Sequence, residues 1–190
     1  MRSPSTIIFS SLLCNYVYGL SQRTTKDIEI VPISEEHIES FHACLDSVAR
    51  ERRYLAGVKA RPIESTREFV LSNIRNNYPQ YVALEGNRVV GWCDIIPLKA
   101  IDFAHCGVLG MGVLKGYRRQ GLGTLLLDAT IGAAKEFGVE RVELEVYTSN
   151  TPAIRLYEKR GFVFEGVKKR ARKLDGEYYD IQVMALFINP

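Results

Sequence analysis

The chain has 190 residues, a length that suits one domain with one sizeable hydrophobic core. Hydrophobic residues make up 46% of the sequence and charged residues 25%, which is ordinary for a globular protein. The formal net charge is +3, from 25 basic and 22 acidic side chains, and this is too small to indicate a nucleic-acid partner. An anionic cofactor could still be held by a few local cations or by backbone amides.

The first two dozen residues differ from the rest of the chain. An apolar run over residues 7–20 follows Arg2, a combination that also occurs in signal peptides. Asn15 interrupts the run, residues 18–21 are a poor cleavage site, and the run is too short to cross a bilayer comfortably. We therefore expect a loosely attached extension over residues 1–26, which could be disordered, a domain over residues 27–190, and no membrane partner.

The domain should begin with a short strand over residues 28–32, which alternates and then stops at a proline. A helix follows, capped by Ser34, and its apolar face recurs at three- and four-residue steps: Ile38, Phe41, Leu45 and Val48. After a basic loop over residues 50–61, a second helix is predicted from Glu64 to Asn76. Its inward face should consist of Phe69, Val70 and Ile74.

A hairpin is predicted next, with strands over residues 81–84 and 89–96 on either side of Gly86-Asn87, a dipeptide that tolerates positive φ. Residues 106–114 form another predicted strand, which is rich in glycine. A long helix should begin after Gly121 and end at Gly138. Its apolar face should consist of Leu122, Leu126, Ala129, Ala133 and Phe137.

Three further elements complete the chain. A strand over residues 141–147 alternates apolar and charged side chains, and Thr151-Pro152 opens a helix with Thr as N-cap. Two closing strands over residues 162–174 and 177–187 are joined at Asp175-Gly176, a strong hairpin signal. This order predicts a single α/β (α+β) domain with one mixed, mostly antiparallel sheet flanked by helices.

The four cysteines are scattered along the chain, at Cys14, Cys44, Cys93 and Cys106. They form no CxxC pair and no metal-like grouping with the three histidines. The sequence therefore predicts a reduced, cytoplasmic protein with buried thiols and no bound metal.

The segment from Gly110 to Thr124 carries the chemistry, because it reads as a strand, a short basic turn and the start of a helix. Helix N-termini expose unpaired N–H groups, and glycines let a backbone approach an anion closely. Such a turn can cradle a phosphate, and Arg118 and Arg119 add positive charge at the same place.

Two common phosphate motifs do not fit this turn. The lysine and hydroxyl residue that complete a Walker A loop are missing, and Leu126 stands where the third glycine of a dinucleotide-binding motif should be. Taken alone, the glycines could also serve only to cap and turn the chain.

The run Arg118-Arg119-Gln120-Gly121-Leu122-Gly123 resembles the acetyl-CoA signature of the GNAT superfamily of N-acetyltransferases. A second family feature follows at the expected distance, because residues 150–162 resemble the segment in which an asparagine, a helix with a tyrosine and a closing Gly-Phe complete the cofactor site. The order of elements over residues 28–187 also follows the family's plan.

The resemblance implies a role for each matching position. Strand backbone at Met111, Gly112 and Val113 would meet the pantetheine arm of acetyl-CoA. Arg118 or Arg119 through Thr124 would hold the pyrophosphate, and Asn150 would hydrogen-bond the cofactor arm. Tyr157 would protonate the departing thiolate. Each of these residues also has a plain structural interpretation, as a core residue, a turn residue or a half-buried aromatic.

The resemblance further implies direct attack of a neutral amine on the thioester, with no covalent enzyme intermediate. Many relatives place a glutamate on the strand before the phosphate turn, but residues 104–113 contain no carboxylate. His105 is the only imidazole there and is our candidate base, since imidazole side chains commonly act as bases near neutral pH. Asp94 and Glu145 could act through water, or could simply be exposed polar residues, and the amine could also lose its proton to solvent.

The acceptor pocket of this family usually lies between the loop after the first helix and the closing hairpin. That implies Arg52, Arg53, Tyr54 and Trp92 as substrate contacts, and an arginine pair could receive a carboxylate bidentately. A solvated basic loop is an equally good interpretation. The acceptor itself could be an amino acid, a polyamine, another small amine or a protein N-terminus.

Two alternatives and one assembly question stay open. The missing strand carboxylate also suits a catalytically silent acyl-CoA-binding module. The basic run over residues 168–173 invites a nucleic-acid interpretation, but a strand would divide its charges between two faces, so we expect no nucleic-acid partner. A homodimer is possible.

Overall fold

The computed structural model describes residues 28–188 and shows one seven-stranded sheet with the order β1-β2-β3-β4-β5-β7-β6. All neighbouring strands are antiparallel except β4 and β5. The strands are β1 (Ile28–Pro32), β2 (Gln80–Glu85), β3 (Arg88–Pro97), β4 (Cys106–Val113), β5 (Arg141–Tyr147), β6 (Val163–Leu174) and β7 (Glu177–Phe187). The extension that we expect over residues 1–26 lies outside the described residues.

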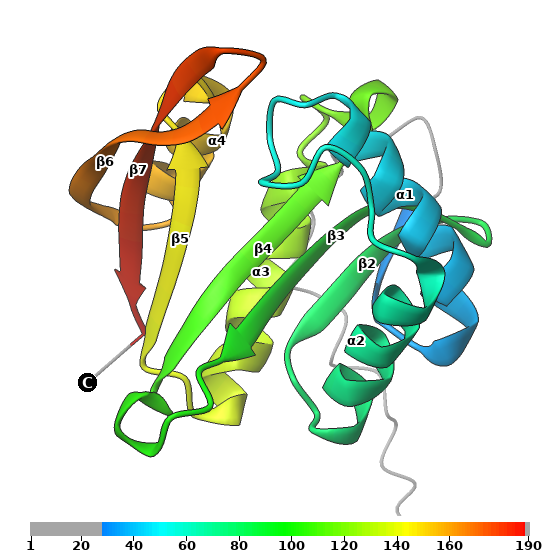
Figure 1. The fold of residues 1–190 in the computed structure, drawn as a ribbon. Coiled ribbons are helices and arrows are strands. Elements are labelled where there is room, and N and C mark those ends of the chain that lie inside the picture. The colour runs from blue at the N-terminus through cyan, green and yellow to red at the C-terminus, as the bar shows by residue number, and fades with distance from the viewer. Residues whose placement is uncertain (1–27, 189–190) are drawn as a thin grey trace, which may run out of the picture.

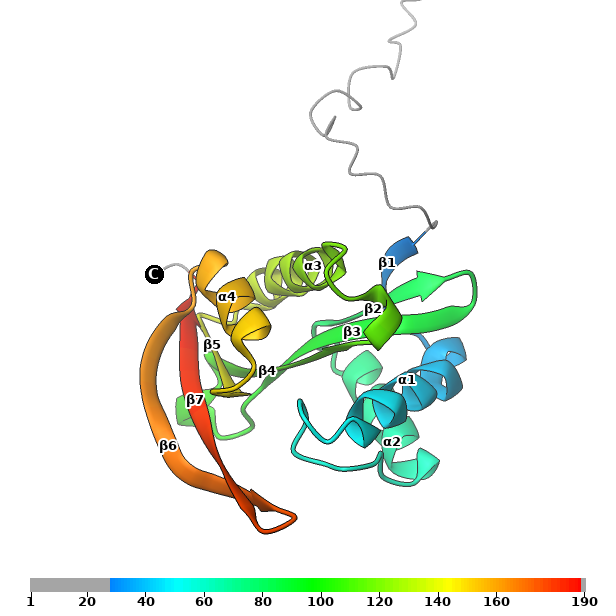
Figure 2. The same ribbon diagram turned by 90° about the horizontal axis from the view of Figure 1, so that it is seen from above.

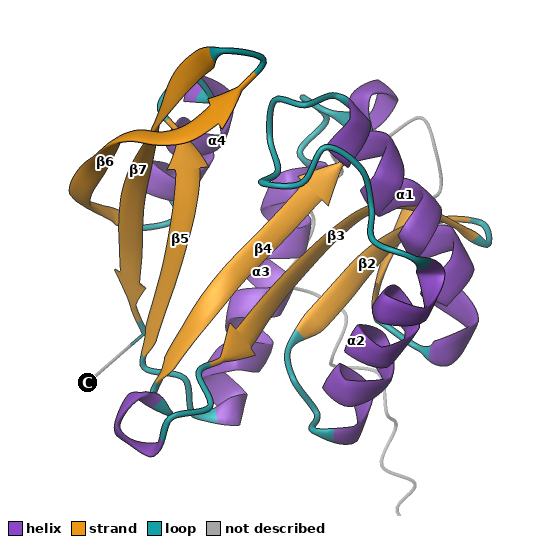
Figure 3. Ribbon diagram, viewed as in Figure 1, coloured by secondary structure: helices purple, strands orange, loops and turns teal. Residues whose placement is uncertain are grey.

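Four helices cover the sheet: α1 (Ile38–Arg50), α2 (Ile63–Arg75), α3 (Leu122–Phe137) and α4 (Thr151–Lys159). Figure 2 shows α1 and α2 on one face and α3 and α4 on the other, and Figure 3 shows how helices and strands alternate. The predicted fold class is therefore confirmed, and each predicted strand and helix is present. None of the helices in residues 28–188 is long and apolar enough to cross a membrane.

The predicted inward faces of two helices need correction. In α2, Phe69 and Ile74 are more than a third exposed, and Val70 is buried beside two polar residues instead. In α3 the buried face is turned relative to the prediction, and it consists of Leu122, Leu126, Leu127, Thr130 and Ala134. A polar residue obscured the pattern in α3, because the Thr130 hydroxyl donates to the Leu126 carbonyl (2.8 Å) and so can be buried without cost.

Two predicted caps differ from the structure, and the other cap and turn signals agree with it. Ser34 is the N-cap of a short 3-10 helix over Glu35–His37, and the N-cap of α1 itself is His37. Gly138 ends α3 with φ 96°, and the closing hairpin turns at Asp175 and Gly176 with φ 53° and 88°. The N-cap of α4 is Asn150 rather than Thr151, which is the first helical residue. The first turn of α4 therefore begins directly after Asn150.

Strands β4 and β5 separate soon after they meet. Their parallel pairing covers only Cys106–Val108 against Arg141–Glu143, and beyond it the two strands diverge (Figure 1). Within residues 28–188, the β5-facing edge of β4 from Leu109 to Val113 therefore has no strand partner. The sheet opens here into a wedge that runs from one face to the other.

The hairpin of β6 and β7 curves over the open end of this wedge (Figure 2). Its register shifts between Lys168 and Arg172, where three residues of β6 stand opposite Asp180 alone, and Arg170 has φ 50°. The Asp180 carboxylate accepts the Arg170 N–H (2.8 Å) and pairs with Lys169 (2.8 Å). The basic run is therefore part of a strand, as the sequence predicted, but it bulges and contacts Asp180 in a way that the sequence did not predict.

Gly112 offers a test of the close contact between β3 and β4. A Cβ at this position would lie 2.3 Å from the nearest ring atom of Trp92, which is itself buried against Phe41. We expect Gly112→Ala to lower the free energy of unfolding by about 1–3 kcal/mol in urea denaturation, because the ring must move in a packed core. The strand control Gly166→Ala, where nothing lies within 4 Å of the new atom, should stay within about 1 kcal/mol. Equal losses in both variants would contradict this packing.

Candidate active site

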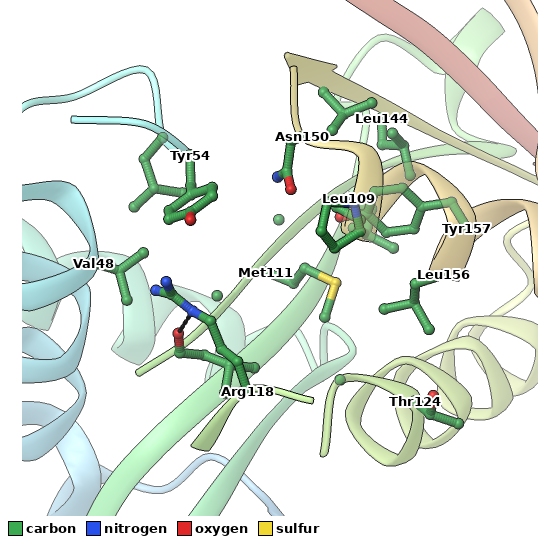
Figure 4. Close-up of a pocket in the computed structure, with 18 of the residues that line it drawn as sticks. Val48, Tyr54, Leu109, Met111, Arg118, Thr124, Leu144, Asn150, Leu156 and Tyr157 are labelled. Carbon is green, nitrogen blue, oxygen red and sulfur yellow. Dashed lines mark hydrogen bonds between the residues drawn. The ribbon is translucent and has the colours of Figure 1, made fainter. Parts of the chain in front are cut away.

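The wedge between β4 and β5 contains a cavity of about 500 Å³, which we call the cleft (Figure 4). Three elements that the sequence singled out line it: β4, the turn into α3, and the start of α4. The predicted cofactor residues that line it are Met111, Gly112, Val113, Arg118, Arg119, Gly121, Gly123, Thr124, Asn150 and Tyr157. Gln120 and Leu122 do not line it. The Gln120 amide donates to the Gly116 carbonyl (3.0 Å), and Leu122 is buried in the core.

The N-terminus of α3 opens at the mouth of the cleft. Gly121 has φ 82°, and its carbonyl accepts the N–H groups of Thr124 (2.9 Å) and Leu125 (3.2 Å). The N–H groups of the first helical residues, including Gly123, have no acceptor within the helix. A Cβ at Gly123 would lie 3.2 Å from Leu156. Only glycine therefore leaves the space in front of these N–H groups fully open to a ligand. The turn therefore has the geometry that favours an anion.

The two arginines of the turn behave differently. The Arg118 guanidinium donates to the Val113 carbonyl (2.7 Å), forms a bidentate pair with Glu51 (2.8 Å for one bond) and lies over the Tyr54 ring (4.6 Å). Figure 4 shows it extended across the cleft between Val48 and Met111. Arg118 thus holds the loop after α1 against β4. Arg119 is exposed, with φ 62°, and it has no ion pair within residues 28–188.

Tyr157 lies on the inner side of α4, beside Leu109 and Leu144 (Figure 4). Its side chain is buried, and its ring contacts that of Phe162 (5.6 Å between centroids). Burial raises the pKa of its phenol well above the ordinary value. The phenol therefore keeps its proton throughout the neutral range and can donate it.

A second cavity, of about 400 Å³, lies on the opposite face beneath α1 and α2, and we call it the α1/α2 cavity. Leu55, Gly110 and Met111 line both this cavity and the cleft. The two hollows therefore adjoin at the same stretch of β4. Trp92, which the resemblance proposed as a substrate contact, lies here, and so does Asp94.

Asp94 is buried, contrary to the expectation that it is an exposed polar residue. Burial raises the pKa of its carboxyl to about 7. The signal that could have revealed it was present in the sequence, because it is the only charged residue between Val89 and Pro97. A single charge in such an apolar strand indicates a special site.

Arg52, Arg53 and Tyr54 line a third cavity, of about 420 Å³, beneath the tip of the hairpin. Arg52 reaches across it and donates to the Asp175 carboxylate (2.7 Å). From the other side Arg172 donates to the Tyr147 hydroxyl (2.8 Å). The four predicted substrate contacts are thus divided, with Trp92 in the α1/α2 cavity and the other three here.

The structure does not bring His105 to the site. His105 is exposed and precedes β4, at the end of the strand opposite to the phosphate turn, and it lines none of the three cavities. Its carbonyl accepts the N–H groups of Glu140 (2.8 Å) and Arg141 (3.1 Å), which is a structural role. Glu145 lines the cleft, but it is half-exposed and paired with Lys168. The role of base that we expected for His105 has no geometric support.

Comparisons with known proteins agree with this geometry. The model of the acetyltransferase (GNAT) family matches residues 41–162. The chain is 35% identical over 121 residues to an N-alpha-acetyltransferase of Saccharolobus solfataricus, covering 58% of this chain and 68% of that protein. It is 32% identical over 112 residues to the L-amino acid N-acetyltransferase AaaT of Escherichia coli, covering 58% and 69%.

Solved structures show the same architecture. A GNAT-family acetyltransferase from Streptococcus pneumoniae superposes with a TM-score of 0.80 at 27% identity, covering 85% of this chain and all of that one. A putative acetyltransferase from Salmonella typhimurium, solved with acetyl-CoA, gives a TM-score of 0.79 at 17% identity, covering 85% and 94%.

The burial of Asp94 predicts a pH-dependent effect on stability. An aspartic acid in the unfolded chain ionises near pH 4, whereas Asp94 in the folded protein holds its proton to about pH 7. Folding therefore loses stability as pH rises from 4 to 7, and the loss is complete above 7. We expect Asp94→Asn to gain about 2–3 kcal/mol relative to the wild type between pH 5 and pH 8 in urea denaturation.

The matched control is Asp128→Asn, because Asp128 is an exposed carboxylate on α3 paired with Arg160 (2.6 Å). Its difference from the wild type should show no gain of this kind with rising pH. A flat difference for Asp94→Asn would mean that Asp94 ionises as freely in the folded chain as in the unfolded one.

Proposed function

The chain belongs to the acetyltransferase (GNAT) family, and from this premise we propose that it transfers an acetyl group from acetyl-CoA to a primary amine by direct attack in a ternary complex. The observation that carries the proposal is the N-terminus of α3, which opens on a cleft between two separated strands. The two named relatives described above act on α-amino groups according to their names, and this supports an α-amine of an amino acid or a peptide as the acceptor.

The residues of the cleft suit acetyl-CoA. The amides after Gly121 offer an anion site for the pyrophosphate, with Arg119 exposed beside them. The edge of β4 from Leu109 to Val113 can pair with the amide groups of the pantetheine arm as it would with a strand. Asn150, at the N-cap of α4, faces the same space.

The protein's own groups supply the remaining chemistry. The neutral Tyr157 phenol holds a proton for the sulfur that leaves. A backbone N–H of β4 near Met111 can stabilise charge on the thioester oxygen. The apolar walls around Tyr157, including Leu109 and Leu144, limit access of water to the thioester.

A catalytically silent acyl-CoA-binding module is the alternative, and the absence of a carboxylate from β4 motivates it. It predicts that calorimetry detects acetyl-CoA binding while no amine in a broad panel releases the free thiol. Release of thiol with any acceptor would remove this alternative.

That the protein forms a homodimer remains a prediction.

The phosphate site can be tested by placing a negative charge at its centre. Gly123→Asp adds a carboxylate in the first turn of α3, where it suits the helix dipole but repels a pyrophosphate. We expect the affinity for CoA, measured by calorimetry, to fall at least about tenfold. The new Cβ would lie 3.2 Å from Leu156 and 3.5 Å from Met111, at the ends of flexible side chains, so the protein should stay folded with a somewhat lower melting temperature.

The same change at Gly132 provides the control, because Gly132 is an exposed position of α3 and a Cβ placed there would have no neighbouring atom within 4 Å. Gly132→Asp should bind CoA like the wild type. Unaltered CoA affinity in Gly123→Asp would place the pyrophosphate elsewhere.

Tyr157→Phe tests the proposed acid. It removes only the phenol oxygen, so packing against Phe162 is retained. We expect kcat to fall by about 10²-fold, in the range of general acid catalysis, with CoA affinity within about threefold of the wild type. The measurement is thiol release with saturating acceptor. A variant with wild-type kcat would show that another group protonates the sulfur.

A further inference from the structure

Asp94 is an uncompensated buried carboxyl group. It is 7% exposed and lies in a strand whose neighbouring side chains, including Trp92, Cys93 and Ile95, are buried and apolar. Within residues 28–188 its carboxylate has neither a hydrogen bond nor an ion pair. Burying such a group destabilises a fold, so its presence indicates a role other than stability.

The carboxylate lines the α1/α2 cavity beside Gly110, one of the residues that the two cavities share. Asp94 stands opposite Gly110 of β4, and a Cβ at Gly110 would be 3.1 Å from its Oδ1. The glycine therefore leaves the carboxylate lying over the backbone of the strand that lines the cleft on its other side. On the β2 side, Asp94 stands opposite Gln80. The Gln80 amide oxygen accepts a hydrogen bond from the Asn73 amide (2.8 Å), while the Gln80 Nε2 is buried without a partner among the described residues.

The rest of the α1/α2 cavity is mainly apolar. Side chains from α1, α2, the loop and β3 form its walls: Phe41, Leu45, Leu55, Phe69 and Trp92. A cavity of about 400 Å³ with apolar walls and one buried carboxylate suits a ligand with an apolar body and a cationic head. Lys59 and Arg61 are exposed where they line it, so the cationic side chains stay near solvent.

We propose that the acceptor amine enters through the α1/α2 cavity with an apolar group attached near its nitrogen, and that Asp94 binds the ammonium group and removes its proton. This inference rests on the proposed acetyl transfer. It assigns the base to β3, whereas the family resemblance leads us to expect a base on the neighbouring strand β4.

The proton balance of the step is complete with the groups present. The Asp94 carboxylate takes one proton from the ammonium group and becomes a carboxylic acid, which later returns that proton to solvent. The freed nitrogen lone pair forms a bond to the carbonyl carbon, and the carbon–sulfur bond breaks. The second nitrogen proton replaces the one that Tyr157 gives to the sulfur, and the third stays on the product amide.

The surroundings of Asp94 favour proton transfer from the ammonium group to its carboxylate near neutral pH. β4 presents only backbone at Gly110. The polar side chains of α2 that line the cavity are Ser65 and Thr66, and the Thr66 hydroxyl is bonded to His42 of α1 (2.9 Å). The loop contributes the cations of Lys59 and Arg61. Because burial raises the pKa of Asp94 to about 7, the arriving ammonium group meets a carboxylate that readily accepts its proton.

The test begins with a panel of matched amines and the full chain. Apolar members are L-leucinamide, L-phenylalaninamide and phenethylamine, and polar members of similar length are L-asparaginamide and putrescine. Thiol release from acetyl-CoA should give a kcat/KM at least about tenfold higher for L-leucinamide than for L-asparaginamide, two amines of nearly equal size.

Asp94→Asn should then lower kcat for the apolar amines by at least about 10²-fold, with unchanged acetyl-CoA affinity in calorimetry. The acidic limb of the wild-type kcat/KM profile should disappear in this variant. Asp94→Glu should recover at least about tenfold of the loss, because it restores a carboxylate. The control Asp128→Asn should behave as the wild type.

Several results would overturn the inference. One is a kcat of Asp94→Asn within about threefold of the wild type. Another is the same large loss in Glu145→Gln in place of Asp94→Asn, and a third is a preference for the polar amines. Failure of the proposed function is distinct, since the wild type would then bind no acetyl-CoA, or would bind it and release no thiol with any amine, polar or apolar. Loss of folding does not confound the test, because Asp94→Asn removes a destabilising charge.

Discussion

The parallel pairing between β4 and β5 ends after three residues, and the site depends on that early separation. A strand edge without a partner is a liability in most folds, because its N–H and C=O groups invite another chain. Here the unpaired edge from Leu109 to Val113 lines a cleft that has the N-terminus of α3 at its mouth. For the proposed acetyl-CoA, one interruption of the sheet would thus supply both a pairing surface for the amide-bearing arm and a nearby site for the phosphates.

The two sides of the cleft are also held together above it. Arg118 links the phosphate turn to the loop after α1 through Glu51, and Arg52 of that loop reaches Asp175 at the tip of the hairpin. The pair of Arg118 and Glu51 is the more sheltered, at 26% and 24% side-chain exposure, so it contributes more to this arrangement than the exposed pair at the tip. The same loop lines all three cavities through Tyr54 or Leu55, so its position affects every ligand site at once.

Local sequence signals predicted the elements that depend on local chemistry. At these places the local sequence restricts the backbone conformation. They are the glycines with positive φ, the proline in the first turn of α4 and the Asp175-Gly176 turn. One error concerns pairing across the sheet, because nothing near Asp94 in sequence states that Gly110 stands opposite it. His105 is a different case, since the predicted strand over residues 106–114 already placed it at the end away from the phosphate turn. The buried face of α3 differs from the prediction for another reason, since the buried Thr130 hydroxyl finds acceptors in the carbonyls of Leu126 (2.8 Å) and Cys93 (3.4 Å).

The glycines of β4 explain how one strand can serve two cavities. Gly110 and Gly112 carry no side chain on the face toward α1 and α2, and Asp94 and Trp92 of β3 lie over them. On the other face Met111 reaches toward Gly123 at the phosphate turn. Around Gly110 and Met111 the two cavities therefore adjoin. In the proposed reaction, an amine in one cavity and a thioester in the other would need no covalent carrier between them, because both would lie against the same few residues of β4.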